Sequence, residues 1–175
     1  MKISLWIIVA GCTIFSTGAH TFEDRASPEV KRHMLVELYQ LMDIDRTIAS
    51  YERNALLPPL QDVEGWGEEE RQCIMRGAHD LLQQPIFDAL LAQTPSELLA
   101  ENVMFYQSEF GQKVNHIVIH GSGLSGLNAA EQQALKQNVA VLSFLRQLTT
   151  TAQQTILDNM RPALEPGILA CTPAP

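Results

Sequence analysis

Apolar residues recur at steps of three and four along almost the whole chain after residue 27, and this spacing limits the fold more than any other feature. Side chains at that spacing share one face of an α-helix, whereas a half-buried strand alternates apolar and polar residues. The sequence shows no such alternation. We therefore predict an all-α protein, a compact helical bundle of five to seven helices formed by residues 28–165. Its longest apolar stripe contains Leu99, Val103, Tyr106, Phe110, Val114 and Ile117.

Capping residues and prolines predict where the helices begin and end. Ser27, Thr94 and Asn128 each precede an apolar stripe, and their side chains can accept hydrogen bonds from first-turn amides. Proline lacks the amide proton that a helix interior needs, so it favours a helix end. We predict a Pro-rich, non-helical C-terminal tail over residues 166–175, and helix ends at Pro58, Pro59, Pro162 and Pro166.

The first nineteen residues have the composition of a secretory signal peptide. Lys2 gives a positive start, residues 3–15 are almost entirely apolar, and small residues follow up to Ala19. The apolar run is too short to span a bilayer, which needs roughly 20 residues. We predict a signal peptide at residues 1–19 that is cleaved after Ala19, a flexible lead-in at residues 20–27, and a mature protein in the bacterial periplasm.

An alternative processing signal overlaps this segment. Val9-Ala10-Gly11-Cys12 matches the pattern that directs a lipid onto a cysteine, which would make the protein a membrane-anchored lipoprotein through Cys12. Only eleven residues precede Cys12, and the apolar run continues beyond it. Cleavage after Ala19 is therefore the favoured interpretation, with the lipid anchor second and an uncleaved anchor third.

The net charge limits the choice of partners. The chain carries −8, and residues 1–19 contain one lysine and no acid, so the mature chain carries −9. Negative charge repels the phosphates of nucleic acid, and no run of Lys or Arg favours an anionic lipid surface. We therefore expect no nucleic-acid partner. We also expect no transmembrane span in the mature chain.

Two cysteines, Cys73 and Cys171, follow the predicted cleavage site. An even number of cysteines in an oxidising compartment favours a disulfide, which here would attach the C-terminal tail to the body of the protein. A bridge that closes a loop of roughly 100 residues contributes about 4–5 kcal/mol in the chain-entropy treatment. The alternative is a buried Cys73 and a free thiol at Cys171.

Two patterns resemble cofactor or metal sites, but their surroundings argue against both. Residues 121–126 read G-x-G-x-x-G, as in dinucleotide-binding proteins, yet no second strand pattern ending in an acid follows about 20 residues later. His116 and His120 are four residues apart, which is half of a zinc site, but no third ligand shares their face. The serines lack a nucleophile elbow. We predict no cofactor, no metal site and no catalytic residues, and we expect that the protein is not an enzyme.

The most distinctive local motif is Phe105-Tyr106-Gln107-Ser108-Glu109-Phe110-Gly111-Gln112-Lys113. We interpret it as a structural corner between two helices, in which Phe105 and Tyr106 are buried, Ser108 is an N-cap and Gly111 allows close approach. Lys113 is expected to be an exposed charge far from any cap. The alternative is that the corner binds a ligand or partner through Lys113 and its neighbour.

This motif resembles the F-Y-x-S-x-x-G-x-K signature of the bacterial family called domain of unknown function 2059. The segments Thr94–Leu98 and Glu37–Met42 fit the same pattern, so the resemblance covers residues 30–118. It implies a small, secreted, all-helical protein of the Gram-negative envelope, and it implies no established activity.

Two functions stay open at this point. The favoured one is a non-enzymatic interaction module that presents helix faces to another envelope protein, and the alternative is a carrier of an apolar small molecule between helices. A cavity lined by Met104, Phe105 and Phe110 would favour the carrier, whereas a closed core with an exposed apolar patch would favour the module. An enzyme of unknown class ranks third.

Overall fold

The structure, a computed structural model, describes residues 26–119 and 123–171 of the chain. This part contains seven α-helices, one 3₁₀ turn and no strand, which confirms the all-α prediction. The predictions for the signal peptide, Cys12, the cleavage site after Ala19 and His120 concern residues outside this part. The elements are α1 (Pro28–Met42), α2 (Ile44–Gln61), α3 (Glu68–Gln93), α4 (Ser96–Gln107), α5 (Glu109–Ile119), η1 (Gly123–Gly126), α6 (Ala129–Gln137) and α7 (Val139–Cys171).

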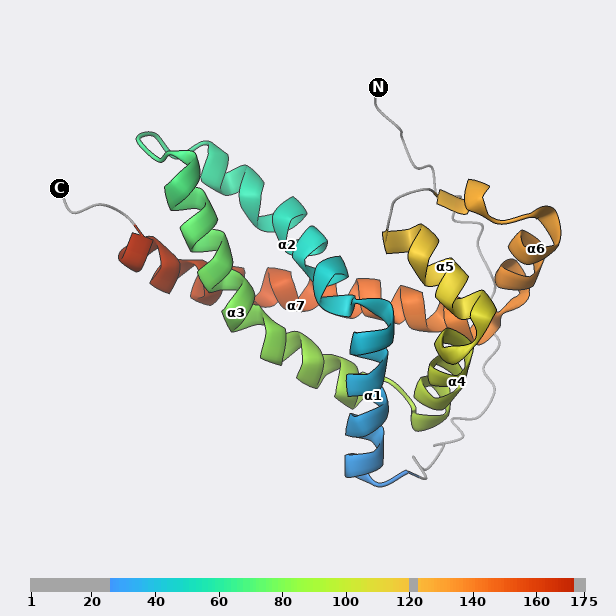
Figure 1. Cartoon of the computed structure of the whole chain (residues 1–175). Coiled ribbons are helices and arrows are strands. Elements are labelled where there is room, and N and C mark those ends of the chain that lie inside the picture. The colour runs from blue at the N-terminus through green and yellow to red at the C-terminus, as the bar shows by residue number, and fades with distance from the viewer. Residues whose placement is uncertain (1–25, 120–122, 172–175) are drawn as a thin grey trace, which may run out of the picture.

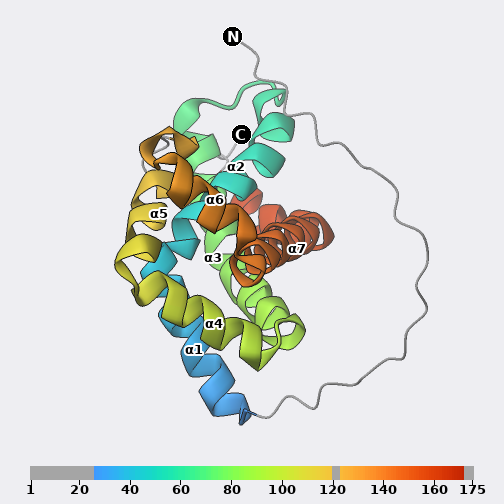
Figure 2. The same ribbon diagram turned by 90° about the vertical axis from the view of Figure 1, so that its right-hand side faces the viewer.

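The seven helices form two groups, as Figure 1 shows. Helices α2, α3 and α7 lie alongside one another, and α3 and α7 share the most extensive contact between any two described elements. Helices α1, α4, α5 and α6 gather at the other end, where α1 packs on α4 and α4 packs on both α5 and α7. In the view turned by 90°, α7 lies at one edge of the bundle (Figure 2).

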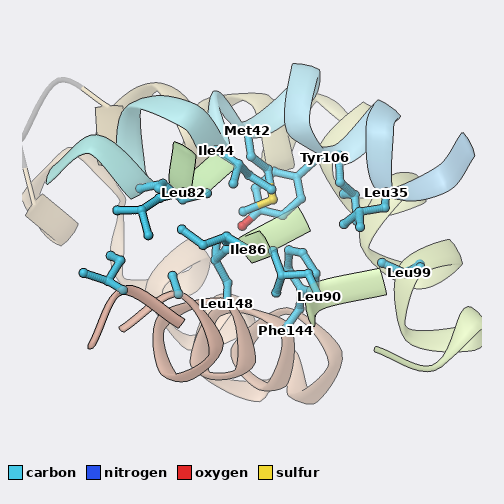
Figure 3. Packing of buried hydrophobic residues seen from close by; sticks show 14 of the residues in the cluster. Leu35, Met42, Ile44, Leu82, Ile86, Leu90, Leu99, Tyr106, Phe144 and Leu148 are labelled. Atoms are coloured by element: carbon cyan, nitrogen blue, oxygen red, sulfur yellow. The ribbon is translucent and has the colours of Figure 1, made fainter. Parts of the chain in front are cut away.

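The hydrophobic core lies where these two groups meet. Phe144 of α7 is fully buried together with Ile86 and Leu90 of α3, Ile44 of α2 and Leu35 of α1 (Figure 3). Burying one side chain of this size contributes about 1.5–3 kcal/mol. The stripes at helical spacing therefore meet in one core cluster within the described residues.

The C-terminal prolines do not end α7, and the prediction that they do was wrong. The helix continues through Pro162 and Pro166 to Cys171, so the tail predicted from residue 166 is helical as far as the description reaches. An interior proline costs about 3 kcal/mol, because it removes one hydrogen bond and crowds the preceding turn. Burial of the neighbouring Ala163 and Leu164 side chains offsets that cost. The same correction applies to α2, which contains Pro58 and Pro59.

Of the caps predicted at Ser27, Thr94 and Asn128, two are confirmed. Ser27 Oγ accepts a hydrogen bond from the amide three residues on (3.3 Å), and Asn128 Oδ1 accepts one from Glu131 N (2.9 Å). Thr94 is not a cap, because Pro95 occupies the N-cap position of α4. The Thr94 side chain is instead buried, with no hydrogen-bond partner for its hydroxyl among the described residues.

Candidate functional site

The corner between α4 and α5 is held by local interactions. Ser108 Oγ donates a hydrogen bond to Phe105 O (2.6 Å) and accepts one from Gly111 N (3.1 Å), so Ser108 caps α5. The Phe105 ring lies edge-on to Tyr106 and to Phe110, with ring centroids 5.0 and 5.7 Å away. Burial of Tyr106 raises the pKa of its hydroxyl. The aromatic side chains of the motif are thus used for packing within the corner.

Gly111 has no room for a side chain. A Cβ atom placed there would clash with the carbonyl oxygen of Phe105, and it would lie 2.6 Å from the carbonyl carbon of Phe105 and 2.8 Å from Cα of Tyr106. These are backbone atoms, so they cannot rotate out of the way as a flexible side chain would. Only glycine fits where α5 folds back on the end of α4.

Lys113 lies next to a helix cap, which contradicts the expectation that it is far from any cap. Its Nζ contacts the two carboxylate oxygens of Glu131 at 2.7 and 2.8 Å. Glu131 also accepts a hydrogen bond from Asn128 N (2.8 Å), which closes the capping box of α6. The hydrogen bond from Lys113, followed by that from the Asn128 amide, holds the pKa of Glu131 below its ordinary value. Lys113 therefore connects α5 to the start of α6.

The three residues proposed to line a carrier cavity do not share one. Met104 is 65% exposed on the surface of α4, whereas Phe105 and Phe110 pack against the hydrophobic core. A cavity enclosed by all three would require Met104 to face inward. The observation that would have favoured the carrier is therefore not found at this position of the fold.

A disulfide joins Cys73 of α3 to Cys171 at the end of α7, as the sequence predicted. The two Cα atoms are 5.9 Å apart, a separation usual for this bond. One helical turn from each cysteine lies a glycine, Gly77 on α3 and Gly167 on α7. A Cβ on Gly167 would lie 3.2 Å from Cα of Ile74, so the two helices approach closely at this point. The inner side of α7 is thus fixed to α3.

A buried carboxylate and a histidine meet between α2 and α3. Glu52 is only 1% exposed, and its Oε2 lies 2.7 Å from Nδ1 of His79. Burial raises the pKa of Glu52, and the hydrogen bond from His79 acts in the opposite direction. The other ring nitrogen of His79 lies 2.8 Å from the side-chain nitrogen of Gln83. Both ring nitrogens are therefore occupied, which leaves His79 without a free nitrogen for a substrate or a metal.

The outer side of the C-terminal half of α7 carries an apolar groove of about 690 Å³. Leu157 is 58% exposed and Leu169 is 79% exposed, and both line this groove. We call this surface the α7 groove. Its described lining comes from α7 alone and consists of Leu157, Asp158, Met160, Arg161, Leu164, Glu165, Ile168 and Leu169.

Charged groups lie among the apolar residues of the α7 groove. Arg161 and Glu165 are exposed and lie one turn apart, and Asp158 accepts a hydrogen bond from the side chain of Gln154 (2.8 Å). No ion pair joins Arg161 or Glu165 to another described residue. The groove therefore combines uncovered apolar surface with two carboxylates and one guanidinium, none of which forms an ion pair with a described residue.

The sequence analysis missed the α7 groove, although the sequence contains a signal for it. Leu157, Met160, Leu164 and Ile168 follow one another at steps of three and four, the spacing of a helical stripe. The stripe continues past Pro162, where the sequence also predicts a helix end. If this spacing is given more weight than Pro162, the sequence predicts a helix with an apolar face over residues 157–168.

Three findings complete the description of candidate sites. Within residues 26–119 and 123–171, no group of three or more His, Cys, Asp or Glu residues is placed to hold a metal ion. No helix in the same ranges is both long enough and apolar enough to span a membrane. Comparisons with protein-family models, with curated proteins and with solved structures found no match to this chain.

Proposed function

We propose that this chain is a non-enzymatic protein-interaction module of the bacterial envelope and that the α7 groove is its docking surface. Its signal peptide, cleaved after Ala19, delivers it to the periplasm. The disulfide between Cys73 and Cys171 is consistent with an extracytoplasmic location. The resemblance of the α4–α5 corner to the domain of unknown function 2059 family is part of the same proposal and adds an envelope location without an activity.

The α7 groove is the observation that carries this proposal. The core cluster buries the apolar stripes of α1, α2, α3, α4 and α7, yet Leu157 and Leu169 stay exposed on the outer side of α7. Contiguous exposed apolar surface with a polar rim is typical of sites that bind other proteins. Covering the exposed part of each Leu favours binding, by less than the about 1.5–3 kcal/mol that complete burial of an exposed Leu contributes.

The shape and charges of the groove define the chemistry of the partner. The groove follows a helix over about three turns, so an amphipathic helix laid alongside it covers the most surface. That helix needs an apolar stripe to cover Leu157 and Leu169. It also needs an acidic group opposite Arg161 and basic groups opposite Asp158 and Glu165, because unpaired charges at a covered interface oppose binding.

A carrier of an apolar small molecule is the second candidate, and the size of the groove is the observation that favours it. Its volume of about 690 Å³ is within the range of small-molecule sites, roughly 300–1,000 Å³. Such sites, however, enclose about 70–90% of the surface of their ligand. The described lining comes from one helix and covers a ligand from one side only, which favours a protein partner.

Photo-crosslinking in cells tests the docking surface. A photoreactive phenylalanine analogue in place of Leu157 should give a covalent adduct of defined mass when the cells are irradiated. The same analogue in place of Val30, which is 51% exposed on α1, is the matched control and should give no such adduct. Adding Leu169→Asp should abolish the adduct at Leu157, because a charge at that position opposes burial of the groove.

The crosslinking results at Leu157 and Val30 separate the two candidate functions. An adduct that forms at Leu157, is absent at Val30 and is lost with Leu169→Asp supports the α7 groove as the docking surface. Equal adducts at Leu157 and Val30, or an adduct that survives Leu169→Asp, would contradict it. Native mass spectrometry of the same protein that finds a bound small molecule, displaced by Leu169→Asp, would favour the carrier instead.

A further inference from the structure

Three arginines line one cavity between α2 and α3, two helices that lie side by side (Figure 1). The cavity has a volume of about 390 Å³, and its described lining consists of Arg53, Leu57, Glu68, Arg71, Gln72, Met75 and Arg76. We propose that this cavity, called here the arginine pocket, binds a small amphiphilic anion, that is, a phosphate or carboxylate group carried on a short apolar chain. The pocket shares no lining residue with the α7 groove, so this inference goes beyond the proposed function.

Helical spacing places the arginines on the two walls of the pocket. On α3, Arg71 and Met75 are four residues apart and Arg76 follows directly, so the three side chains lie on neighbouring positions of one helix face. On α2, Arg53 and Leu57 are also one turn apart. Eighteen and 23 residues of sequence separate Arg53 from Arg71 and Arg76. The chain therefore contains no run of basic residues here, and only the fold gathers the three charges.

The arginine pocket is positive in an acidic protein. Three guanidinium groups and the single carboxylate of Glu68 give its lining a formal charge of +2, whereas the mature chain carries −9. No ion pair or hydrogen bond joins the side chains of Arg53 or Arg76 to another residue within 26–119 and 123–171. The chain has 20 acidic and 12 basic residues, so carboxylates are plentiful, yet Glu68 alone lines this cavity. Like charges around one cavity repel each other and attract an anion.

Arg71 has only a weak partner for its charge. Its side chain is 21% exposed, and its Nε lies 3.9 Å from Oε2 of Glu68, beyond the hydrogen-bond range of about 2.7–3.2 Å. The Glu68 side chain is 71% exposed, and its Oε1 accepts a hydrogen bond from Gln72 Nε2 (2.9 Å). An ion pair with such a solvated carboxylate contributes little. A bound oxyanion would give Arg71 the close partner that the fold does not supply.

The lining also defines the two parts of the ligand. A guanidinium group presents paired N–H donors that match two oxygens of a phosphate or a carboxylate. Leu57 is half-buried, and Met75 packs against the hydrophobic core while its remaining surface lines the cavity. The volume lies within the roughly 300–1,000 Å³ of small-molecule sites. A charged head on an apolar chain therefore uses both kinds of wall, whereas an inorganic anion uses only the charged one.

Isothermal titration calorimetry of the mature, disulfide-bonded protein tests the pocket with three probes. These are octyl phosphate, octanoate and inorganic phosphate. We expect octyl phosphate to bind with a Kd below about 1 mM and at least about tenfold more tightly than inorganic phosphate, because its chain covers apolar surface. The comparison of octyl phosphate with octanoate identifies the preferred head group.

Charge substitutions locate the binding. Arg53→Gln and Arg76→Gln change exposed residues and should each weaken octyl phosphate binding at least about fivefold. Glu68→Gln removes the one lining carboxylate and should tighten binding, because that carboxylate repels the anion. Arg146→Gln is the matched control, the same charge change at an exposed position of α7 that does not line the pocket. This variant and Leu169→Asp in the α7 groove should leave the affinity unchanged, and thermal midpoints confirm that all variants are folded.

Binding that falls with Arg53→Gln and Arg76→Gln and survives Arg146→Gln supports the arginine pocket, whichever head group is preferred. No binding of octyl phosphate or octanoate up to about 1 mM overturns the proposal. An affinity that is unchanged at positions 53 and 76, or that falls equally with Arg146→Gln, also overturns it. Inorganic phosphate binding as tightly as octyl phosphate rejects the amphiphilic ligand. The crosslinked adduct at Leu157 reports on a different surface, so failure of either proposal leaves the other standing.

Discussion

The α4–α5 corner and the α7 groove differ in how many of their side chains have a partner within the protein. At the corner, Ser108 caps a helix, Gly111 is in contact with backbone and Lys113 is paired with Glu131. In the groove, Leu157 and Leu169 are more than half exposed. The corner carries the most distinctive motif of the chain, whereas no motif marks the groove. The side chains of a distinctive motif can therefore serve packing alone, and the exposed apolar surface of this protein lies elsewhere.

Removing the disulfide should have the largest effect on stability. The bridge holds the end of α7, the helix that carries the groove, whereas no disulfide holds the α4–α5 corner. Replacing both Cys73 and Cys171 by Ala should lower the free energy of unfolding by about 2–5 kcal/mol, since the bridge closes a loop with a sequence separation of 98 residues. Urea denaturation of the oxidised protein and the double variant measures the difference. Equal midpoints would show that the bridge does not stabilise the fold.

Gly111→Leu should have the next largest effect and tests whether the corner is structural. The new side chain would meet the backbone of Phe105 and Tyr106, and overpacking of this kind costs about 1–3 kcal/mol. Thermal unfolding followed by circular dichroism measures the loss. The matched control compares Gly111→Ala with Gly77→Ala, because both glycines lie inside helices and a Cβ at position 77 would meet nothing closer than 3.9 Å. If the two alanine variants are equally stable, close packing does not explain the glycine at 111.

Ser108→Ala should lower stability by about 1 kcal/mol, because it removes the cap of α5. Ser108→Asp keeps an acceptor at the same position and should restore most of the loss. Chemical denaturation of the two variants gives both values. If Asp fails to restore the loss, the hydroxyl acts in another way than as a cap.

Lys113→Ala should have the smallest effect of the four, because its pair with Glu131 is exposed to solvent. Since the pKa of Glu131 is lowered in the folded state, its contribution is present at neutral pH. That contribution is lost as the pH falls from the ordinary value of 4.5 through the lowered pKa. Thermal midpoints of the variant and the unmodified protein should therefore differ slightly at pH 7 and converge in acid. A large loss at pH 7 would show that Lys113 does more than join α5 to α6.

Local signals predicted a large part of this fold. The helical spacing of apolar residues gave the fold class, and the side chains of Ser27 and Asn128 marked helix starts, because each signal acts within one or two turns. The disulfide was also predictable, since only two cysteines follow the predicted cleavage site. These are cases in which the interacting groups are either close in sequence or few in number.

Long-range packing explains where the sequence misled. Pro162 and Pro166 favour a helix end locally, but contact with α3 and the bond at Cys171 keep α7 helical. The buried pair of Glu52 and His79 joins two helices that no spacing rule relates. The sequence predicts a helix end at Pro162, and for that reason it does not predict the α7 groove, which lies on both sides of that proline. Such features depend on which helix faces meet, and a single sequence does not specify that.

Under the proposed function, the corner maintains the fold while the α7 groove binds a partner. The most direct test measures the thermal midpoint and the photo-crosslinked adduct at Leu157 for two variants, Ser108→Ala and Leu169→Asp. We predict that Ser108→Ala lowers the midpoint and leaves the adduct intact, whereas Leu169→Asp leaves the midpoint unchanged and abolishes the adduct. The account is contradicted if Ser108→Ala removes the adduct without lowering the midpoint, or if Leu169→Asp unfolds the protein and the adduct persists in its folded fraction.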